Sequence, residues 1–227
     1  MVPVLLLSVA ALAWSGVSNL LLGDDGYLLR NLLLTVVLLL GAHRAGWAAG
    51  ELGLARRSLW RGASVGLVTA GVVVAVVVVA VVLADRVPLI AGLLADERAA
   101  ASSDRLFYEV VLRIPLGTAL FEEVLFRGVL FAGWRRAAGE RAAMIGSSVV
   151  FGLWHVAPTA VALERNGVAV GSAMGVLGII GGVVVTTIAG LLFVWLRRVS
   201  ASLVAPILAH AATNVAGLLA AADLVNG

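Results

Sequence analysis

The sequence predicts an all-α protein, a polytopic bundle of about seven transmembrane helices with one further amphipathic helix at the membrane interface. Of the 227 residues, 62% are hydrophobic and 13% are charged, whereas soluble domains are about 45–50% apolar and about 25% charged. Seven apolar stretches are near the length, roughly 20 residues, that crosses a hydrocarbon core. We expect helices because an isolated strand in lipid leaves its backbone groups unpaired.

The seven apolar stretches cover about 3–22, 28–45, 62–84, 114–134, 142–157, 171–196 and 201–221. The first lacks the basic start and the small-residue cleavage site of a secretory signal, so we expect a membrane helix there. The third is rich in valine from Val72 to Val82, which would favour a buried strand in water. That run is too long for a strand.

Arginine-rich connections follow the second, fourth and sixth stretches. They contain Arg44, Arg56, Arg57 and Arg61, then Arg135, Arg136 and Arg141, and finally Arg197 and Arg198. By the positive-inside rule these connections are cytoplasmic, which places the N-terminus inside and the C-terminus outside. A loop of mixed charge is expected from Asp85 to Asp104.

The basic residues also indicate partners. All sixteen are arginine, and they lie in short dispersed clusters, so we expect contacts with membrane lipids and not with nucleic acid. Exclusive use of arginine points to a GC-rich bacterial genome, and hence to a multi-pass protein of the plasma membrane. The absence of cysteine excludes disulfides, thiolate metal sites and cysteine nucleophiles.

Residues 102–113 have the pattern of an amphipathic helix. Ser103 or Asp104 could cap its start, and Arg105, Glu109 and Arg113 recur every four residues on one polar face. We expect this helix to lie at the interface and to lead into the fourth crossing. A role in guiding substrate is the alternative.

Four ionisable positions inside the apolar stretches stand out: Glu122, Glu123, His155 and His210. Each costs at least a few kcal/mol to insert, so each indicates function. Glu123 can pair with Arg127 four residues later, which leaves Glu122 without a local partner. We therefore expect Glu122 to act as a general acid or base. The alternative is a buried ion pair that only fixes helix packing.

The histidines offer further chemistry. His155 lies near the end of the fifth stretch, and His210 shares a helix face with Asn214, where helix-to-helix hydrogen bonding is the alternative role. His43 is expected at a membrane boundary. Together with Glu122 the set could activate water and hold an oxyanion, as peptide hydrolysis requires. Alternatively Glu122, His155 and His210 could bind Zn²⁺.

Other classes are less compatible with the sequence. It contains no His-Glu-x-x-His, no Gly-x-Ser-x-Gly around a buried serine and no Gly-x-Gly-Asp with a second membrane aspartate. A non-catalytic scaffold or immunity-type protein could retain the same polar residues for packing. A small proton-coupled transporter could use them as a relay, although it would more often have paired, broken helices.

Three motifs carry a family resemblance. They are Glu122-Glu123-x-x-x-Arg127, Phe151-x-x-x-His155 and His210-x-x-x-Asn214. In order and on separate expected helices, they resemble the signature of the CAAX-protease and bacteriocin-processing (CPBP) family, also called the CAAX prenyl protease 2 or Abi family. The resemblance covers about residues 114–220. From this resemblance we expect N-terminal transmembrane helices at 1–100 and a catalytic membrane domain at 101–227, together forming one integral membrane unit.

The resemblance implies an intramembrane endopeptidase that acts on a membrane-associated protein or peptide. Glu122 and His155 would activate the water, and His210 and Asn214 would stabilise the oxyanion. Glu123 and Arg127 would support them. The family has been described both as metal-dependent and as glutamate-dependent; we expect no cofactor here, with a divalent metal such as Zn²⁺ as the alternative. A prenylated C-terminal motif is the substrate that gives the family its name.

Overall fold

The structure is a computed structural model that describes residues 1–84, 86–87 and 102–226. Its helices are α1 (Val2–Gly16), η1 (Val17–Leu22), α2 (Tyr27–Arg44), η2 (Arg56–Ser58), α3 (Leu59–Ala84), α5 (Ser103–Tyr108), η4 (Glu109–Leu120), α6 (Phe121–Glu123), η5 (Val124–Leu130), α7 (Phe131–Trp154), α8 (Val156–Arg165), α9 (Ala173–Ser200) and α10 (Val204–Asn226). Within these ranges no residue forms a strand. The predicted all-α class is therefore confirmed.

Among the described residues, six helices are long and apolar enough to cross a membrane, which confirms the polytopic prediction. They are Val2–Leu22, Tyr27–Arg44, Arg56–Ala84, Ser103–Arg165, Ala173–Ser200 and Val204–Val225. The fourth contains two of the predicted crossings in 63 continuous residues. Its backbone is not helical at Gly139, where φ is 84° and ψ is −179°, a conformation that suits a residue without Cβ. The chain turns there, so this one span contains both the fourth and the fifth predicted crossing.

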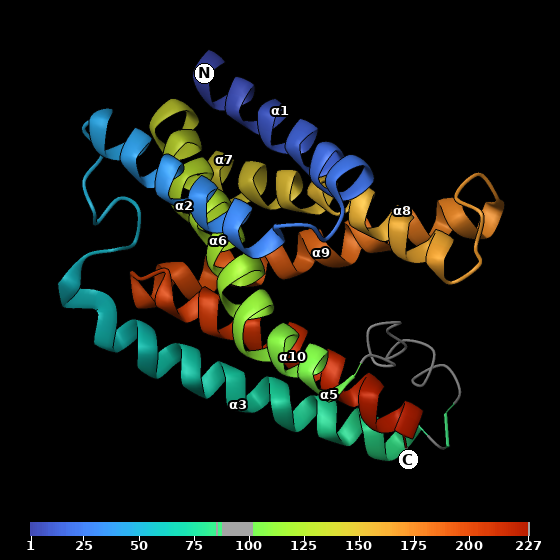
Figure 1. The fold of residues 1–227 in the computed structure, drawn as a ribbon. Coiled ribbons are helices and arrows are strands. Elements are labelled where there is room, and N and C mark those ends of the chain that lie inside the picture. Colours follow the sequence, from blue (N-terminus) through green and yellow to red (C-terminus); the bar gives the residue numbers. More distant parts are fainter. Residues whose placement is uncertain (85, 88–101, 227) are drawn as a thin grey trace.

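The surface of the bundle is apolar. Val72, Val76 and Val82 on α3 are each more than half exposed, although valine in a soluble protein is usually buried. Their exposure fits a fold whose solvent is hydrocarbon. The opposite side of α3 packs along α10, and the two helices run side by side across the base of the view in Figure 1.

The helix that runs from α5 to the first turns of α7, before Gly139, passes through the centre of the bundle (Figure 1). All residues from 121 to 132 are buried, because α1, α2 and α9 pack against this stretch. Pro115 lies within η4 and has no N–H to donate, which is consistent with the wide π-helical turns there. Two glutamates and an arginine are thereby carried into the interior.

The start of this helix corrects one prediction. Ser102, and not Ser103 or Asp104, is the cap, and its side chain accepts a hydrogen bond from the backbone N–H of Arg105 at 3.4 Å. The amphipathic segment then continues into the crossing without a break. Its connection to α3, predicted from Asp85 to Asp104, lies largely outside the described residues.

The arginine-rich connections meet at one end of the bundle. Arg136 pairs with Glu51 at 2.8 Å, and Arg197 donates a hydrogen bond to the backbone carbonyl of Glu51. The backbone N–H of Leu203 donates to the carbonyl of Gly53 at 2.8 Å. Three connections that are distant in sequence are thus joined on one side, as alternating crossings require.

Candidate active site

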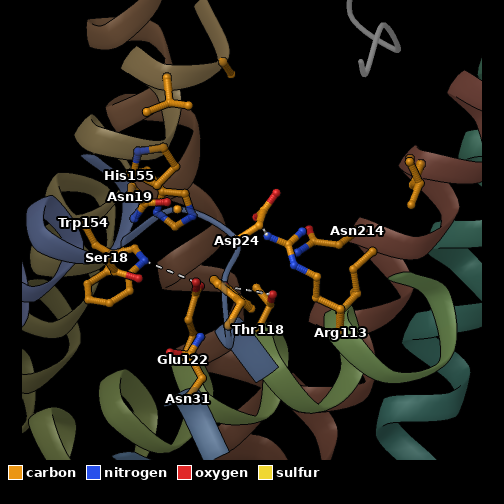
Figure 2. A pocket seen from close by; sticks show the side chains of 18 of the residues that line it. Ser18, Asn19, Asp24, Asn31, Arg113, Thr118, Glu122, Trp154, His155 and Asn214 are labelled. Atoms are coloured by element: carbon orange, nitrogen blue, oxygen red, sulfur yellow. Dashed lines mark hydrogen bonds and ion pairs between the residues drawn. The ribbon is translucent and has the colours of Figure 1, made fainter. Parts of the chain in front are cut away.

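A cavity of about 520 Å³ opens beside the central helix, between η1, α2, η4, the junction of α7 with α8, and α10. Three of the residues singled out in the sequence line it: Glu122, His155 and Asn214. Figure 2 shows them converging from three different helices. The other three, Glu123, Arg127 and His210, form a buried layer next to Glu122.

The carboxylate of Glu122 is held on one side only. Its side chain is buried, and Oε1 accepts a hydrogen bond from Trp154 Nε1 at 3.2 Å. Oε2 has no hydrogen-bond partner among the residues that the structure describes, and His210 Nε2 lies 3.8 Å from it. A buried carboxylate oxygen without a partner is costly in a folded protein, so Oε2 is the atom available for chemistry.

Glu123 and Arg127 form the predicted ion pair. Arg127 Nη1 donates to Glu123 Oε1 at 3.0 Å, and both side chains are fully buried. The guanidinium also lies over the ring of Phe151, 4.0 Å from its centroid, and near Phe193, where the π-electrons favour a cation. The opposite charges of Glu123 and Arg127 therefore compensate each other in the low-dielectric interior.

His210 joins this pair to Glu122. Its Nδ1 lies 2.8 Å from Glu123 Oε1, and since an ionised carboxylate only accepts, Nδ1 is the donor. The ring is stacked on Phe193 with 5.0 Å between centroids. With Nδ1 and the ring plane both fixed, Nε2 is directed towards Glu122.

His155 is positioned by the end of a helix. It closes α7 and begins α8 with φ −81° and ψ 0°, and its Nδ1 donates to the carbonyl of Phe151 at 2.8 Å. In the neutral ring this leaves Nε2 with a lone pair, so it is able to accept a proton. Asn214 lies one turn beyond His210 on α10 and adds an amide to the cavity wall.

In the arrangement seen here, the side chains are not gathered into the alternative zinc site. Among the described residues, no group of three or more His, Cys, Asp or Glu side chains is arranged to hold a metal ion. Glu122 and His210 lie together, and the bond from His155 Nδ1 to the Phe151 carbonyl leaves the Nε2 of that ring free. The chemistry proposed below uses these residues as acids, bases and hydrogen-bond donors.

One wall of the cavity was not anticipated. Ser18, Asn19, Tyr27 and Asn31 line it, although the first two apolar stretches had been assigned only a membrane-spanning role. Asn31 is buried and donates through Nδ2 to the carbonyl of Gly117 at 2.8 Å. A buried asparagine in the first turns of an apolar stretch was the signal that could have revealed this wall.

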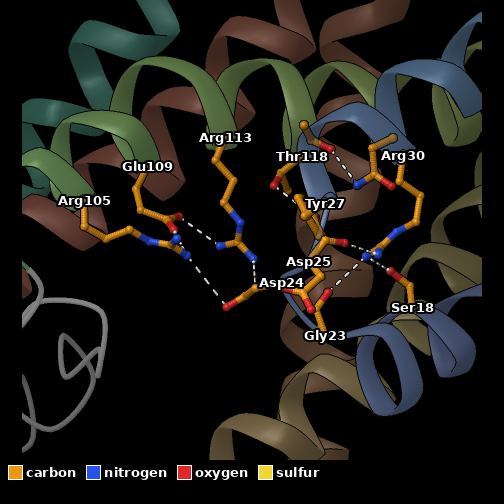
Figure 3. Close-up of polar contacts among 12 residues, drawn as sticks. Ser18, Gly23, Asp24, Asp25, Tyr27, Arg30, Arg105, Glu109, Arg113 and Thr118 are labelled. Atoms are coloured by element: carbon orange, nitrogen blue, oxygen red, sulfur yellow. Dashed lines mark hydrogen bonds and ion pairs between the residues drawn. The ribbon is translucent and has the colours of Figure 1, made fainter.

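The rim of the cavity is an ionic cluster (Figure 3). Arg113 lies 2.5 Å from Asp24 and 2.9 Å from the buried carboxylate of Glu109, and Arg105 also pairs with Glu109 at 2.9 Å. This confirms the polar face predicted for Arg105, Glu109 and Arg113. The guanidinium of Arg113 lies 4.3 Å from the centroid of the Tyr27 ring. The cluster thus ties the turn between η1 and α2 to η4.

Comparison with known proteins gives one match. Residues 105–216 match the family model described as type II CAAX prenyl endopeptidase Rce1-like. No curated protein and no solved structure is similar enough to match the chain.

Proposed function

Residues 105–216 of this chain belong to the Rce1-like family of type II CAAX prenyl endopeptidases, and from that premise we propose that the protein hydrolyses a peptide bond in membrane-associated proteins or peptides. The single observation that carries the proposal is the environment of Glu122. It is a buried carboxylate that faces a cavity, and its Oε2 accepts no hydrogen bond from the described residues. His155 and Asn214 line the same cavity.

In the first step, Glu122 and His155 activate a water molecule. One of them takes a proton as the water oxygen attacks the carbonyl carbon, so a C–O bond forms and the carbonyl π-electrons move to oxygen. Two bases near one cavity support this role. The arrangement suits attack in a site that excludes bulk water, because Glu122 is only 4% exposed.

In the second step, His210 and Asn214 stabilise the oxyanion by hydrogen bonding. Because Nδ1 donates to Glu123, Nε2 is the ring atom that faces Glu122 and the reacting group, and it donates to the oxyanion when it carries a proton. Collapse of the intermediate breaks the C–N bond, and the proton taken in the first step passes to the leaving nitrogen. Glu123 and Arg127 keep His210 in place and do not touch the substrate.

The substrate class follows from the family and the setting. The matched model is named for prenylated CAAX proteins, so a lipid-modified peptide is the first class to test. The polar wall of Ser18, Asn19, Tyr27 and Asn31 would face the peptide main chain. We further propose that residues 1–100 act as transmembrane helices that accompany a catalytic domain at 101–227.

The test is cleavage of fluorogenic peptides, prenylated and unmodified, by the purified full-length protein. Glu122→Gln keeps the size of the side chain and removes its basicity, so kcat should fall by about 10²- to 10⁴-fold. Glu164→Gln is the matched control because Glu164 is exposed on α8 and should leave kcat unchanged. Cleavage that persists in Glu122→Gln would overturn the mechanism. If the wild type cleaves none of the peptides, the non-catalytic scaffold would instead be favoured.

A further inference from the structure

Trp154 is the one described side chain that donates a hydrogen bond to Glu122. Its indole is buried, with 5% of the residue exposed, and it packs against Phe121 and Phe126 with centroids 5.9 and 5.5 Å away. An indole has only one N–H and no acceptor. Because the ring is confined by its neighbours, the direction of that N–H, and hence of the Glu122 carboxylate, is fixed.

The backbone of Trp154 has an unusual position in its helix. A helical carbonyl normally accepts from the N–H four residues later, which for Trp154 would be residue 158. That residue is proline and has no N–H to give. The next carbonyl, of His155, does find its normal partner in Thr159 at 3.0 Å. Pro158 thus frees one particular carbonyl at the edge of the cavity.

Ser15 takes the place of the missing N–H. Its hydroxyl donates to the carbonyl of Trp154 at 2.6 Å, and the serine is 2% exposed. Ser15 lies on α1, 139 residues earlier in the chain and outside the segment 105–216 that matches the family model. A side chain of the first helix therefore holds Trp154, and Trp154 in turn holds Glu122.

From this chain of contacts we propose that Trp154 is a positioning residue for Glu122, and that Ser15 is a positioning residue for Trp154. The inference rests on the role of Glu122 in the proposed function. The indole N–H holds Oε1, so that Oε2 is the oxygen presented to water. The hydroxyl of Ser15 holds the turn at which α7 ends, so that the indole and the following His155 keep their places.

The kinetic test compares Trp154→Phe with Trp134→Phe. Trp134 is the matched control because its indole nitrogen is buried without a hydrogen-bond partner among the described residues. Loss of a hydrogen bond to a charged group should lower kcat by about 10- to 100-fold in Trp154→Phe and leave KM within about twofold. Trp134→Phe should retain the wild-type kcat. A Trp154→Phe variant with wild-type kcat would overturn the inference.

The second arm tests Ser15. Ser15→Ala should lower kcat by about three- to tenfold, whereas Ser8→Ala, which removes a buried hydroxyl bonded within α1, should not. Because Ser15 acts in part through the Trp154 indole, Ser15→Ala should lower kcat by a smaller factor in Trp154→Phe than in the wild type. Independent, multiplying losses in the double variant would contradict this order of action.

A spectroscopic arm separates this inference from the proposed function. The chain has six tryptophans, so the indole ¹⁵N–¹H signal of Trp154 can be assigned through Trp154→Phe. That signal should shift in Glu122→Leu and in Ser15→Ala but not in Ser8→Ala. If it is unchanged in Glu122→Leu, the contact is absent and the inference fails whatever the activity. The Trp154 signal could instead shift in Glu122→Leu while Glu122→Gln keeps wild-type kcat. The hydrogen bond between Trp154 and Glu122 would then be real, but both the proposed mechanism and the positioning role would be wrong.

Discussion

Glu123 Oε1 accepts hydrogen bonds from both His210 Nδ1, at 2.8 Å, and Arg127 Nη1, at 3.0 Å. One buried carboxylate oxygen thus orients an imidazole on α10 and neutralises an arginine on its own helix. The two contacts have different consequences, because the first affects chemistry and the second affects stability. Variants of this triad can separate them.

The first prediction concerns Glu123→Gln. Removing the charge leaves Arg127 buried without a counterion, so the protein should lose about 3 kcal/mol of unfolding free energy, measured by denaturant or thermal unfolding in detergent. Adding Arg127→Met should restore most of that stability, since neither charge then remains. The double variant should stay poorly active because His210 is still without its carboxylate. Wild-type kcat in the double variant would contradict the proposed role.

A second prediction concerns the oxyanion. Asn214→Ala should lower kcat by about 10²-fold with little change in KM, as loss of one oxyanion donor does. The comparison is steady-state cleavage of the same peptide by wild type and variant. A raised KM with normal kcat would instead assign Asn214 to substrate binding.

The third prediction is the response to chelators. Because no three of the described His, Asp or Glu side chains are arranged as metal ligands, cleavage by the purified protein should continue after dialysis against EDTA or phenanthroline. Complete loss of activity, with recovery on adding Zn²⁺, would show that the site rearranges around a metal and that the glutamate mechanism is wrong.

A fourth prediction is a pH dependence of stability at the arginine-rich end. Hydrogen bonds from Arg136 and from the backbone N–H of Ala48 lower the pKa of Glu51 from its ordinary value of 4.5 to about 2. Because this pKa is lower in the folded state than in the unfolded state, ionised Glu51 stabilises the fold at pH values above the unfolded pKa. That stabilisation is lost as the pH falls towards the folded pKa. The melting temperatures of wild type and Glu51→Gln should therefore differ at pH 6 and converge between about pH 4.5 and 2. A constant difference would refute the assignment.

The fifth prediction is topology. We propose that the arginine-rich end faces the cytoplasm, following the positive-inside rule. The chain has no cysteine, so Arg57→Cys and Asp25→Cys each provide one thiol. In intact cells an impermeant maleimide should label Asp25→Cys and not Arg57→Cys. The reverse pattern would invert the assignment.

Much of the fold could be predicted because the membrane restricts it. Apolar length and composition located the helices, and the cost of burying charge identified Glu122, Glu123 and His210. The spacing of Glu123 and Arg127 correctly predicted their pair, since residues four apart share a helix face. These inferences need only local sequence and the properties of lipid.

The contacts between distant helices could not be predicted. The positions of Ser15 and Asn31 in the sequence do not predict which residues of another helix they contact, because those contacts depend on the angles at which the helices cross. The hydrogen bond from Trp154 to Glu122 likewise spans 32 residues. The cap at Ser102 was missed by one residue because three successive polar side chains can all serve as caps.

The cavity has walls from both halves of the chain, with η1 and α2 on one side and the matched segment on the other. A shortened protein limited to residues 105–216 would keep Glu122, His155 and His210 but would expose them through an open side. Such a fragment would be a poor starting point for engineering or for a minimal assay. Supplying the first two helices as a separate polypeptide offers a complementation test of whether the enzyme is one indivisible unit.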